Sequence, residues 1–163
     1  MKLLSLWEPW ATLMALGAKK IETRSWSTSY RGWLAIQASK GGLSRRDLIH
    51  QCRQPEFSNA LKALDGFDTW NFMDIKYREI FPFGKIVAVV KLGTCLNTRH
   101  IAHDLAERPF GNYEPGRFAW ITTDLFRLPE PIPFKAKQGL CDVPDDVVAE
   151  IRKQWPGTKE RVA

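Results

Sequence analysis

The chain of 163 residues lacks the short motifs of several common enzyme classes. It contains no G-x-S-x-G sequence, no P-loop and no G-x-G-x-x-G sequence. These absences argue against a serine hydrolase of that type, an NTPase and a dinucleotide-dependent enzyme. The chain also lacks an apolar run long enough to cross a bilayer and an N-terminal stretch with the apolar core of a signal peptide. We therefore expect a cytoplasmic protein with no membrane partner.

Cysteine and histidine are scarce, with three residues of each. The cysteines are widely separated and form no C-x-x-C pair, which argues against a disulfide framework and a zinc ribbon and predicts free, buried thiols. They are Cys52, Cys95 and Cys141. His100 and His103 could share one face of a short helix predicted over residues 98–106, but no third ligand lies at a suitable spacing. We therefore expect no metal site and no cofactor.

What the chain has in excess is positive charge and tryptophan. Its formal net charge is +6, its pI is about 9.4, and seven residues are tryptophan. A basic protein suits a polyanionic partner. Indole rings can stack on nucleic-acid bases, although core packing is the expected role of most of them. The length fits one domain, over residues 1–163.

The most informative stretch is Gly17-Ala-Lys-Lys-Ile-Glu-Thr-Arg24. Residues 7–16 predict a short helix, which the glycine ends in a left-handed conformation. In an extended strand after it, Glu22 and Arg24 would point to the same side, and Lys19 would lie at the corner between the two elements. The segment therefore predicts a charged row at a helix-to-strand corner. The alternative interpretation is a purely structural network of ion pairs.

Apolar and β-branched runs predict further strands, of which residues 83–96 give the strongest signal and should lie at the centre of a barrel. The other expected strands cover residues 3–6, 31–38 and 117–125. Residues 129–133, rich in proline, are expected to leave the sheet in an extended form. Helical spacing predicts an insert over residues 44–80 and an amphipathic helix over residues 144–155.

The spacing of the charged stretch matches the G-x-K-x-x-E-x-R signature of the ASCH superfamily, which the chain resembles from about Lys2 to Leu140. Residues 30–36 and 110–120, Tyr-Arg-Gly-Trp-Leu-Ala-Ile and Phe-Gly-Asn-Tyr-Glu-Pro-Gly-Arg-Phe-Ala-Trp, are similar to two further parts of bacterial and phage-type members. The resemblance implies an α+β fold, a β-barrel like that of the PUA domains of RNA-modifying proteins, with peripheral helices. It also implies a cleft between the helix and the barrel that holds RNA or a nucleotide.

In such a cleft, Lys19 and Arg24 could contact phosphate or a base edge. The carboxylate of Glu22 could accept a hydrogen bond from an exocyclic amine of a base. The leading hypothesis is therefore an RNA- or nucleotide-binding protein, with a role in RNA processing or modified-nucleoside metabolism.

An alternative is a small hydrolase. One branch of the superfamily resembles an amidohydrolase acting on acetylated cytidine, with a lysine at the position of Lys19, a threonine at that of Glu22 and a more distant glutamate. The present chain has glutamate instead of the threonine, and this carboxylate could act as a general base. Either Glu107 or Glu114 could supply the distant carboxylate. Other relatives are reported as ribonucleases, and a protein-interaction module is a third possibility.

Two arginines beside glycines form a second set of candidates, Arg31 and Arg117. In each pair the glycine permits close approach of the backbone and the arginine offers a planar fork for phosphate or carboxylate. We expect both at the rim of the cleft, with Tyr113 and Trp26 as stacking partners. A solvated strand-entry arginine and a packing aromatic are the simpler alternatives.

Overall fold

Six strands form one mixed sheet in the order β2-β5-β4-β3-β1-β6. The computed structural model describes residues 1–68, 77–103 and 105–155. The strands are β1 (Lys2–Leu6), β2 (Ile21–Arg24), β3 (Gly32–Ala38), β4 (Lys85–Asn97), β5 (Phe118–Pro133) and β6 (Leu140–Asp142). The helices are α1 (Trp10–Ala15), α2 (Arg45–Arg53), α3 (Pro55–Leu61), α4 (Tyr77–Ile80), α5 (Asp145–Gln154) and the short 3-10 turns η2 (Thr98–His100) and η3 (Arg108–Phe110).

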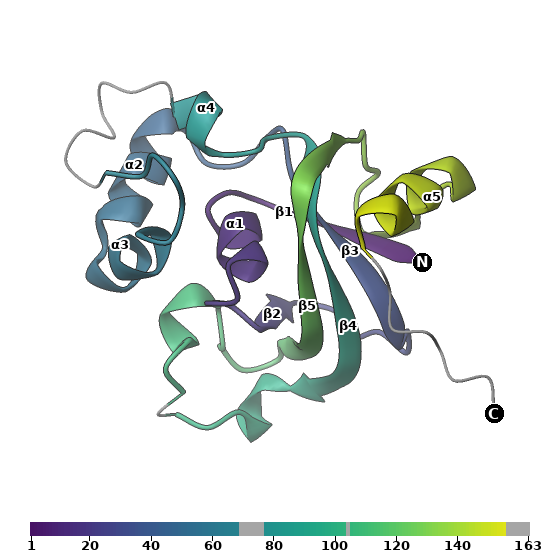
Figure 1. Ribbon diagram of the computed structural model, residues 1–163. Helices are drawn as coiled ribbons and strands as arrows, with labels where there is room; N and C mark the ends of the chain where they lie inside the picture. Colours follow the sequence, from purple (N-terminus) through teal and green to yellow (C-terminus); the bar gives the residue numbers. More distant parts are fainter. Residues whose placement is uncertain (69–76, 104, 156–163) are drawn as a thin grey trace.

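The sheet is curled into a half-barrel, as Figure 1 shows. Strands β1 and β3 run parallel, and the other neighbours are antiparallel. Strand β4 lies inside the sheet between β3 and β5, and its residues 86–90 are buried. The predicted α+β class, with a barrel-like sheet and peripheral helices, is therefore confirmed.

Helix α1 lies between the concave face of the sheet and the helices α2 and α3 (Figure 1). Ala11, Met14 and Ala15 pack in one apolar cluster with β1, β3 and β4. Leu13 packs in a second cluster with the helices of the insert. A six-residue helix is too short to be stable alone, so burial on both sides holds it in place.

The insert expected over residues 44–80 contains helices α2, α3 and α4. Ser44 caps α2, because its hydroxyl accepts a hydrogen bond from the backbone N–H of Asp47 at 3.2 Å. The expected helix over residues 98–106 is wrong: only the 3-10 turn η2 forms, and Ile101 leaves it in an extended conformation. Residues 69–76 and 104 of these two predictions lie outside the described part of the chain.

The expectation that residues 129–133 leave the sheet is also wrong, because β5 continues to Pro133. Ile132 pairs with Ile86, whereas the preceding pair joins Arg127 to Ala88. Residues 128–131 therefore form a bulge opposite β4. Prolines fit there because a bulge tolerates residues that donate no ladder hydrogen bond.

Helix α5 covers the other face of the sheet, where Ile151 is fully buried. The side-chain amide of Gln154 accepts from the backbone N–H of Glu130 and donates to its carbonyl, both at 2.9 Å. The backbone of the β5 bulge is thus hydrogen-bonded to the last residue of α5.

Candidate functional site

The side chain of Lys19 is buried at the corner between α1 and β2, with 1% of its surface exposed. Its ammonium donates to the carbonyl oxygens of Ile21 and of Phe110, the latter at 2.9 Å, and lies 3.3 Å from Oε2 of Glu22. An ammonium has three N–H donors, and three acceptors surround this one. Lys19 therefore holds the start of β2, the segment of Phe110 and the carboxylate of Glu22 together.

The second oxygen of Glu22 faces Arg24, whose Nε lies 3.0 Å from Oε1. The Nη2 atom of Arg24 donates to the carbonyl of Ser5 on β1 at 3.1 Å. The side chains of Glu22 and Arg24 remain 13% and 26% exposed. Two cations thus fix one carboxylate that solvent still reaches.

Glu22 and Arg24 line an open cleft of about 680 Å³ between β2, the N-terminal end of α1 and residues 109–112. Three tryptophans line it, Trp7, Trp10 and Trp26, and the side chains of Trp7 and Trp26 are 54% and 37% exposed. Trp26 also contacts the buried Trp120 edge to face, with ring centroids 4.6 Å apart. One aromatic surface is therefore rigidly supported.

Residues 107–117 close this side of the cleft by hydrogen bonds to β2. Nε of Arg117 donates to the carbonyl of Asn112 and its Nη2 to the carbonyl of Thr23, each at 3.1 Å. The backbone N–H of Asn112 donates to the hydroxyl of Thr23 at 3.0 Å. Arg117 lines the cleft, and its contacts also hold the wall in place.

Of the two candidates for a further carboxylate, Glu107 reaches the corner. Its Oε2 accepts from the backbone N–H groups of Lys20 at 2.6 Å and Ile21 at 2.9 Å. Glu114 is exposed, and its backbone carbonyl accepts from the hydroxyl of Thr98. The Glu107 carboxylate anchors the backbone at the beginning of β2.

Of the predicted site residues, Glu22, Arg24, Trp26 and Arg117 line the cleft, whereas the buried Lys19 and the carboxylates of Glu107 and Glu114 do not. The remaining two candidates, Arg31 and Tyr113, are likewise not among the described residues of its lining. Arg31 is exposed and donates from Nη1 to the carbonyls of Thr28 and Tyr30. The ring of Tyr113 lies under Arg108, 5.0 Å from its guanidinium carbon. Burial, helped by the negative charge of Glu107, raises the pKa of the Tyr113 hydroxyl to about 12.

The geometry of the corner can be set beside known proteins. The family model of the ASCH domain matches residues 4–132. The chain belongs to the ASCH domain family. The resemblance stated from the signature is therefore confirmed.

Two curated relatives and two solved structures illustrate how far the similarity of this ASCH domain extends. It is 30% identical over 96 residues to Activating signal cointegrator 1 of Homo sapiens and of Mus musculus, an alignment that covers 59% of the chain and only 14% of each relative. It is similar in fold to ASCH from Zymomonas mobilis, with a TM-score of 0.52, 11% identity and 93% of both chains covered. A point variant of that protein gives a TM-score of 0.51 at 11% identity, with 93% and 96% covered. At this identity the structures establish the fold alone.

Several residues of the cleft in this ASCH domain were not predicted. They are Ser5, Trp7, Trp10, Gln51, Asn112 and Gln138. They come from strands, helices and loops far apart in the sequence, so no local spacing identifies them. No sequence pattern distinguishes the exposed Trp7 from the other tryptophans, most of which are expected to pack in the core.

A buried carboxyl close to the cleft also lacked a sequence signal. Glu8 precedes α1 and accepts hydrogen bonds from the backbone N–H of Thr12 at 3.1 Å and from its hydroxyl at 2.9 Å. Burial raises the pKa of Glu8 from 4.5 to about 7, and the two bonds from Thr12 oppose the rise. Burial of the Cys52 thiol, and to a smaller extent the negative charge of Glu8, raises the pKa of Cys52 to about 12.

Within residues 1–68, 77–103 and 105–155, no group of three or more metal-ligating side chains converges. The described helices include none with the length and apolarity that a bilayer span requires. The three cysteines are free thiols, of which Cys52 is buried and Cys95 and Cys141 are half-buried.

Proposed function

We propose that this ASCH domain binds single-stranded RNA or a nucleotide in the cleft beside β2. The observation that carries the proposal is the Glu22 carboxylate, which Lys19 and Arg24 hold between them while one side stays open to a cleft with exposed indoles. A carboxylate fixed in this way is an acceptor for the amino group of a base. The indoles of Trp7 and Trp26 offer flat surfaces on which bases can stack.

The cleft also supplies cations for phosphate. Arg24 uses Nε and Nη2 in the contacts described, and a guanidinium carries five N–H donors, so Nη1 can serve a ligand. Arg117 lies at the same cleft, and the net charge of +6 attracts polyanions over a longer range. Aromatic, carboxylate and cationic groups in one hollow suit a ligand that combines a base with phosphate.

The geometry favours binding over the hydrolase alternative. A lysine that acts as an acid, base or nucleophile needs its amine close to the substrate, whereas the ammonium of Lys19 is directed at two carbonyls and Glu22. The Glu107 carboxylate is likewise engaged with backbone N–H groups. Both groups position the corner, and Glu22 is the one that faces the cleft.

The test is a titration of the protein into fluorescently labelled single-stranded RNA at low and at high salt. We expect affinity to fall with salt, and Arg24→Gln to weaken binding about tenfold and reduce the salt slope by about one. Trp26→Ala should remove about 1–3 kcal/mol of binding free energy if it stacks on a base. Arg31→Gln is the matched control, because Arg31 is exposed outside the cleft.

Competition with unlabelled mononucleotides distinguishes an RNA site from a nucleotide site, because a mononucleotide that binds in the cleft would displace the labelled RNA. No binding at low salt, or equal losses in the Arg24 and Arg31 variants, would reject the proposed cleft. Incubation of the same protein with acetylcytidine and with RNA examines hydrolysis. Product formation that Glu22→Gln abolishes would replace binding alone with catalysis at this site.

A further inference from the structure

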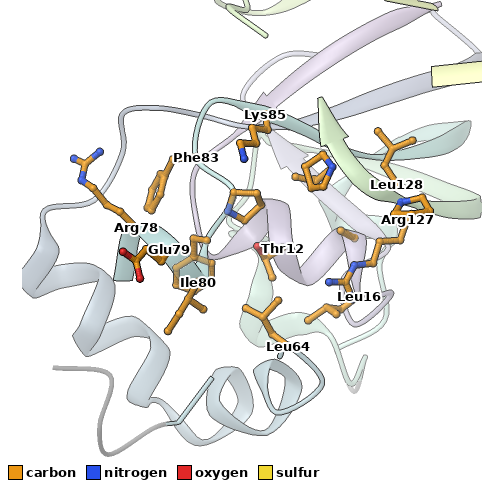
Figure 2. A pocket seen from close by; sticks show the side chains of 16 residues that line it. Thr12, Leu16, Leu64, Arg78, Glu79, Ile80, Phe83, Lys85, Arg127 and Leu128 are labelled. Carbon is orange, nitrogen blue, oxygen red and sulfur yellow. The ribbon is translucent and has the colours of Figure 1, made fainter. Parts of the chain in front are cut away.

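A second hollow lies on the opposite side of α1 from the cleft. It has a volume of about 450 Å³ and is bounded by α1, by α4 with the segment that follows it, and by the bulge of β5 (Figure 2). Thr12 and Leu16 face it, whereas Trp10, on the other side of the helix, lines the cleft. We call this hollow the bulge cavity. Its volume falls within the range of small-molecule sites.

The walls of the bulge cavity combine apolar side chains with polar and charged ones. They include Leu16, Leu64, Ile80, Phe83 and Leu128 and the prolines at 82, 129 and 131. Leu128 and the two latter prolines belong to the bulge, whose backbone the amide of Gln154 holds at Glu130 through two hydrogen bonds. The bulge wall of the cavity is therefore held in place before any ligand arrives, which lowers the cost of binding.

Three cations and one carboxylate are among the lining residues, those of Arg78, Lys85, Arg127 and Glu79. The guanidinium of Arg78 is stacked on the rings of Tyr77 and Phe83, at 5.6 Å from each centroid. Lys85 and Arg127 are exposed, and no described residue forms a hydrogen bond or ion pair with either side chain. The rim thus has an excess of positive charge.

Figure 2 shows how these two cations are placed. Lys85 lies at the Phe83 end of the cavity, and the guanidinium of Arg127 lies at the Leu16 end, with the apolar surface between them. A guanidinium presents a planar fork that matches phosphate and carboxylate with two parallel hydrogen bonds. The ammonium of Lys85 is a point charge, which attracts an anion electrostatically but does not form two parallel hydrogen bonds with it.

We propose that the bulge cavity binds a small organic anion, consisting of a planar apolar ring and one phosphate or carboxylate group. The charged group pairs with Arg127, the ring lies against Phe83 and Leu16, and Lys85 strengthens the field from the opposite rim. The site is separate from the cleft at β2 and does not depend on the function proposed for it.

Phenyl phosphate and benzoate are suitable probes, with benzyl alcohol as the neutral ring and inorganic phosphate as the charge without a ring. Binding is followed by calorimetry and by shifts of the backbone amide signals of Thr12, Leu16 and Phe83 in NMR spectra. We expect one or both anions to bind and to shift these signals, and the alcohol and inorganic phosphate to bind at least tenfold more weakly. The comparison of the two anions tells whether phosphate or carboxylate is the preferred group.

Four variants at three positions test the assignment. Arg127→Gln should weaken the binding of the better anion about tenfold, the usual value of a charge-assisted hydrogen bond, and Arg127→Lys should restore only part of it. Lys85→Gln should weaken the binding of the anion a few-fold, and Arg24→Gln, in the other hollow, should leave the affinity for the anion unchanged although it weakens RNA binding. All three positions carry exposed or half-exposed side chains, and thermal unfolding verifies that each variant is folded.

Three results would overturn the proposal. The first is the absence of binding by both anions, and the second is equal binding of benzyl alcohol. The third is an affinity that survives in Arg127→Gln but is lost in Arg24→Gln, which would place the anion in the cleft.

Discussion

The two hollows on either side of α1 use charged residues in opposite ways. At the cleft, Lys19 and Arg24 form ion pairs with the two oxygens of Glu22, and the result is a carboxylate held still beside a half-open space. In the bulge cavity, Lys85 and Arg127 have no ionic partner among the described residues. The difference shows that paired charges build an acceptor of fixed geometry, whereas unpaired cations leave an attraction for an incoming anion. Substitutions in each region can test whether this contrast holds.

The largest expected effect is at Lys19. Lys19→Met would remove the ammonium and leave Glu22 and two buried carbonyls without their donor, which typically costs about 3–5 kcal/mol of the free energy of unfolding. Lys20→Met, at the exposed neighbouring position, should change stability by less than about 0.5 kcal/mol. Urea unfolding of both variants measures the difference. Equal stabilities would mean that the pairing in the cleft is energetically unimportant.

Glu8 offers a third kind of carboxyl, buried without a cation. Because its pKa rises from 4.5 to about 7 on folding, the folded state holds a proton that the unfolded state releases, and stability should fall as pH rises through this window. The full effect is at most about 3 kcal/mol, from 1.36 kcal/mol per pKa unit. Above about pH 7 the contribution of Glu8 to the free energy of unfolding no longer changes with pH.

Glu8→Gln should flatten that part of the stability profile, measured by thermal unfolding across the pH range. Glu107→Gln provides a comparison at a carboxylate hydrogen-bonded to backbone N–H groups. A slope that persists unchanged in the Glu8 variant would assign the pH dependence to another group.

The packing of the cleft wall is tested at Gly111. A Cβ at this position would lie 2.7 Å from the ring of Tyr113 and 3.2 Å from Cγ2 of Thr23. Gly111→Ala should therefore destabilise by about 1–3 kcal/mol, the range of overpacked sites, and weaken RNA binding by displacing the wall. Gly41→Ala, where the added Cβ meets no atom within 4 Å, is the control. Stability that is the same in both variants would contradict a tightly packed wall.

The smallest expected effect concerns the wall of the bulge cavity. Gln154→Ala would remove the two hydrogen bonds to the backbone of Glu130 and cost about 1 kcal/mol. We expect this variant to weaken the anion probes severalfold without changing RNA affinity, whereas Lys153→Ala should leave both unchanged. Parallel titrations of the two ligands measure this. A change in RNA affinity alone would show that the two hollows are not separated in the way described.

Local periodicity predicted much of the fold. Residues 21–24 alternate between buried and half-buried positions, as expected of a strand with one face on the core. The β-branched run near residue 86 became an interior strand because so apolar a segment must be covered on both faces. The helix ended by Gly17 and the ASCH signature likewise follow from neighbouring residues.

The contacts and burial of the charged side chains could not be predicted from local periodicity. Whether Lys19 faces solvent depends on the carbonyl of Phe110, which is 91 positions away. The β5 bulge was missed because proline usually ends a ladder, and only its register with β4 and the contact with Gln154 show that the strand resumes. Arg31 and Tyr113, predicted at the cleft from their neighbours in the sequence, lie apart from its lining for the same reason.

The long reach of Lys19 has a consequence during translation. Its corner is synthesised early on the ribosome, but the carboxylate of Glu107 and the carbonyl of Phe110 emerge only after β4, and β5, which pairs with β2, follows them. Until then the ammonium stays hydrated, and Glu22 and Arg24 have no wall opposite them. A nascent chain that stops before residue 107 therefore carries the complete signature but no recognition surface.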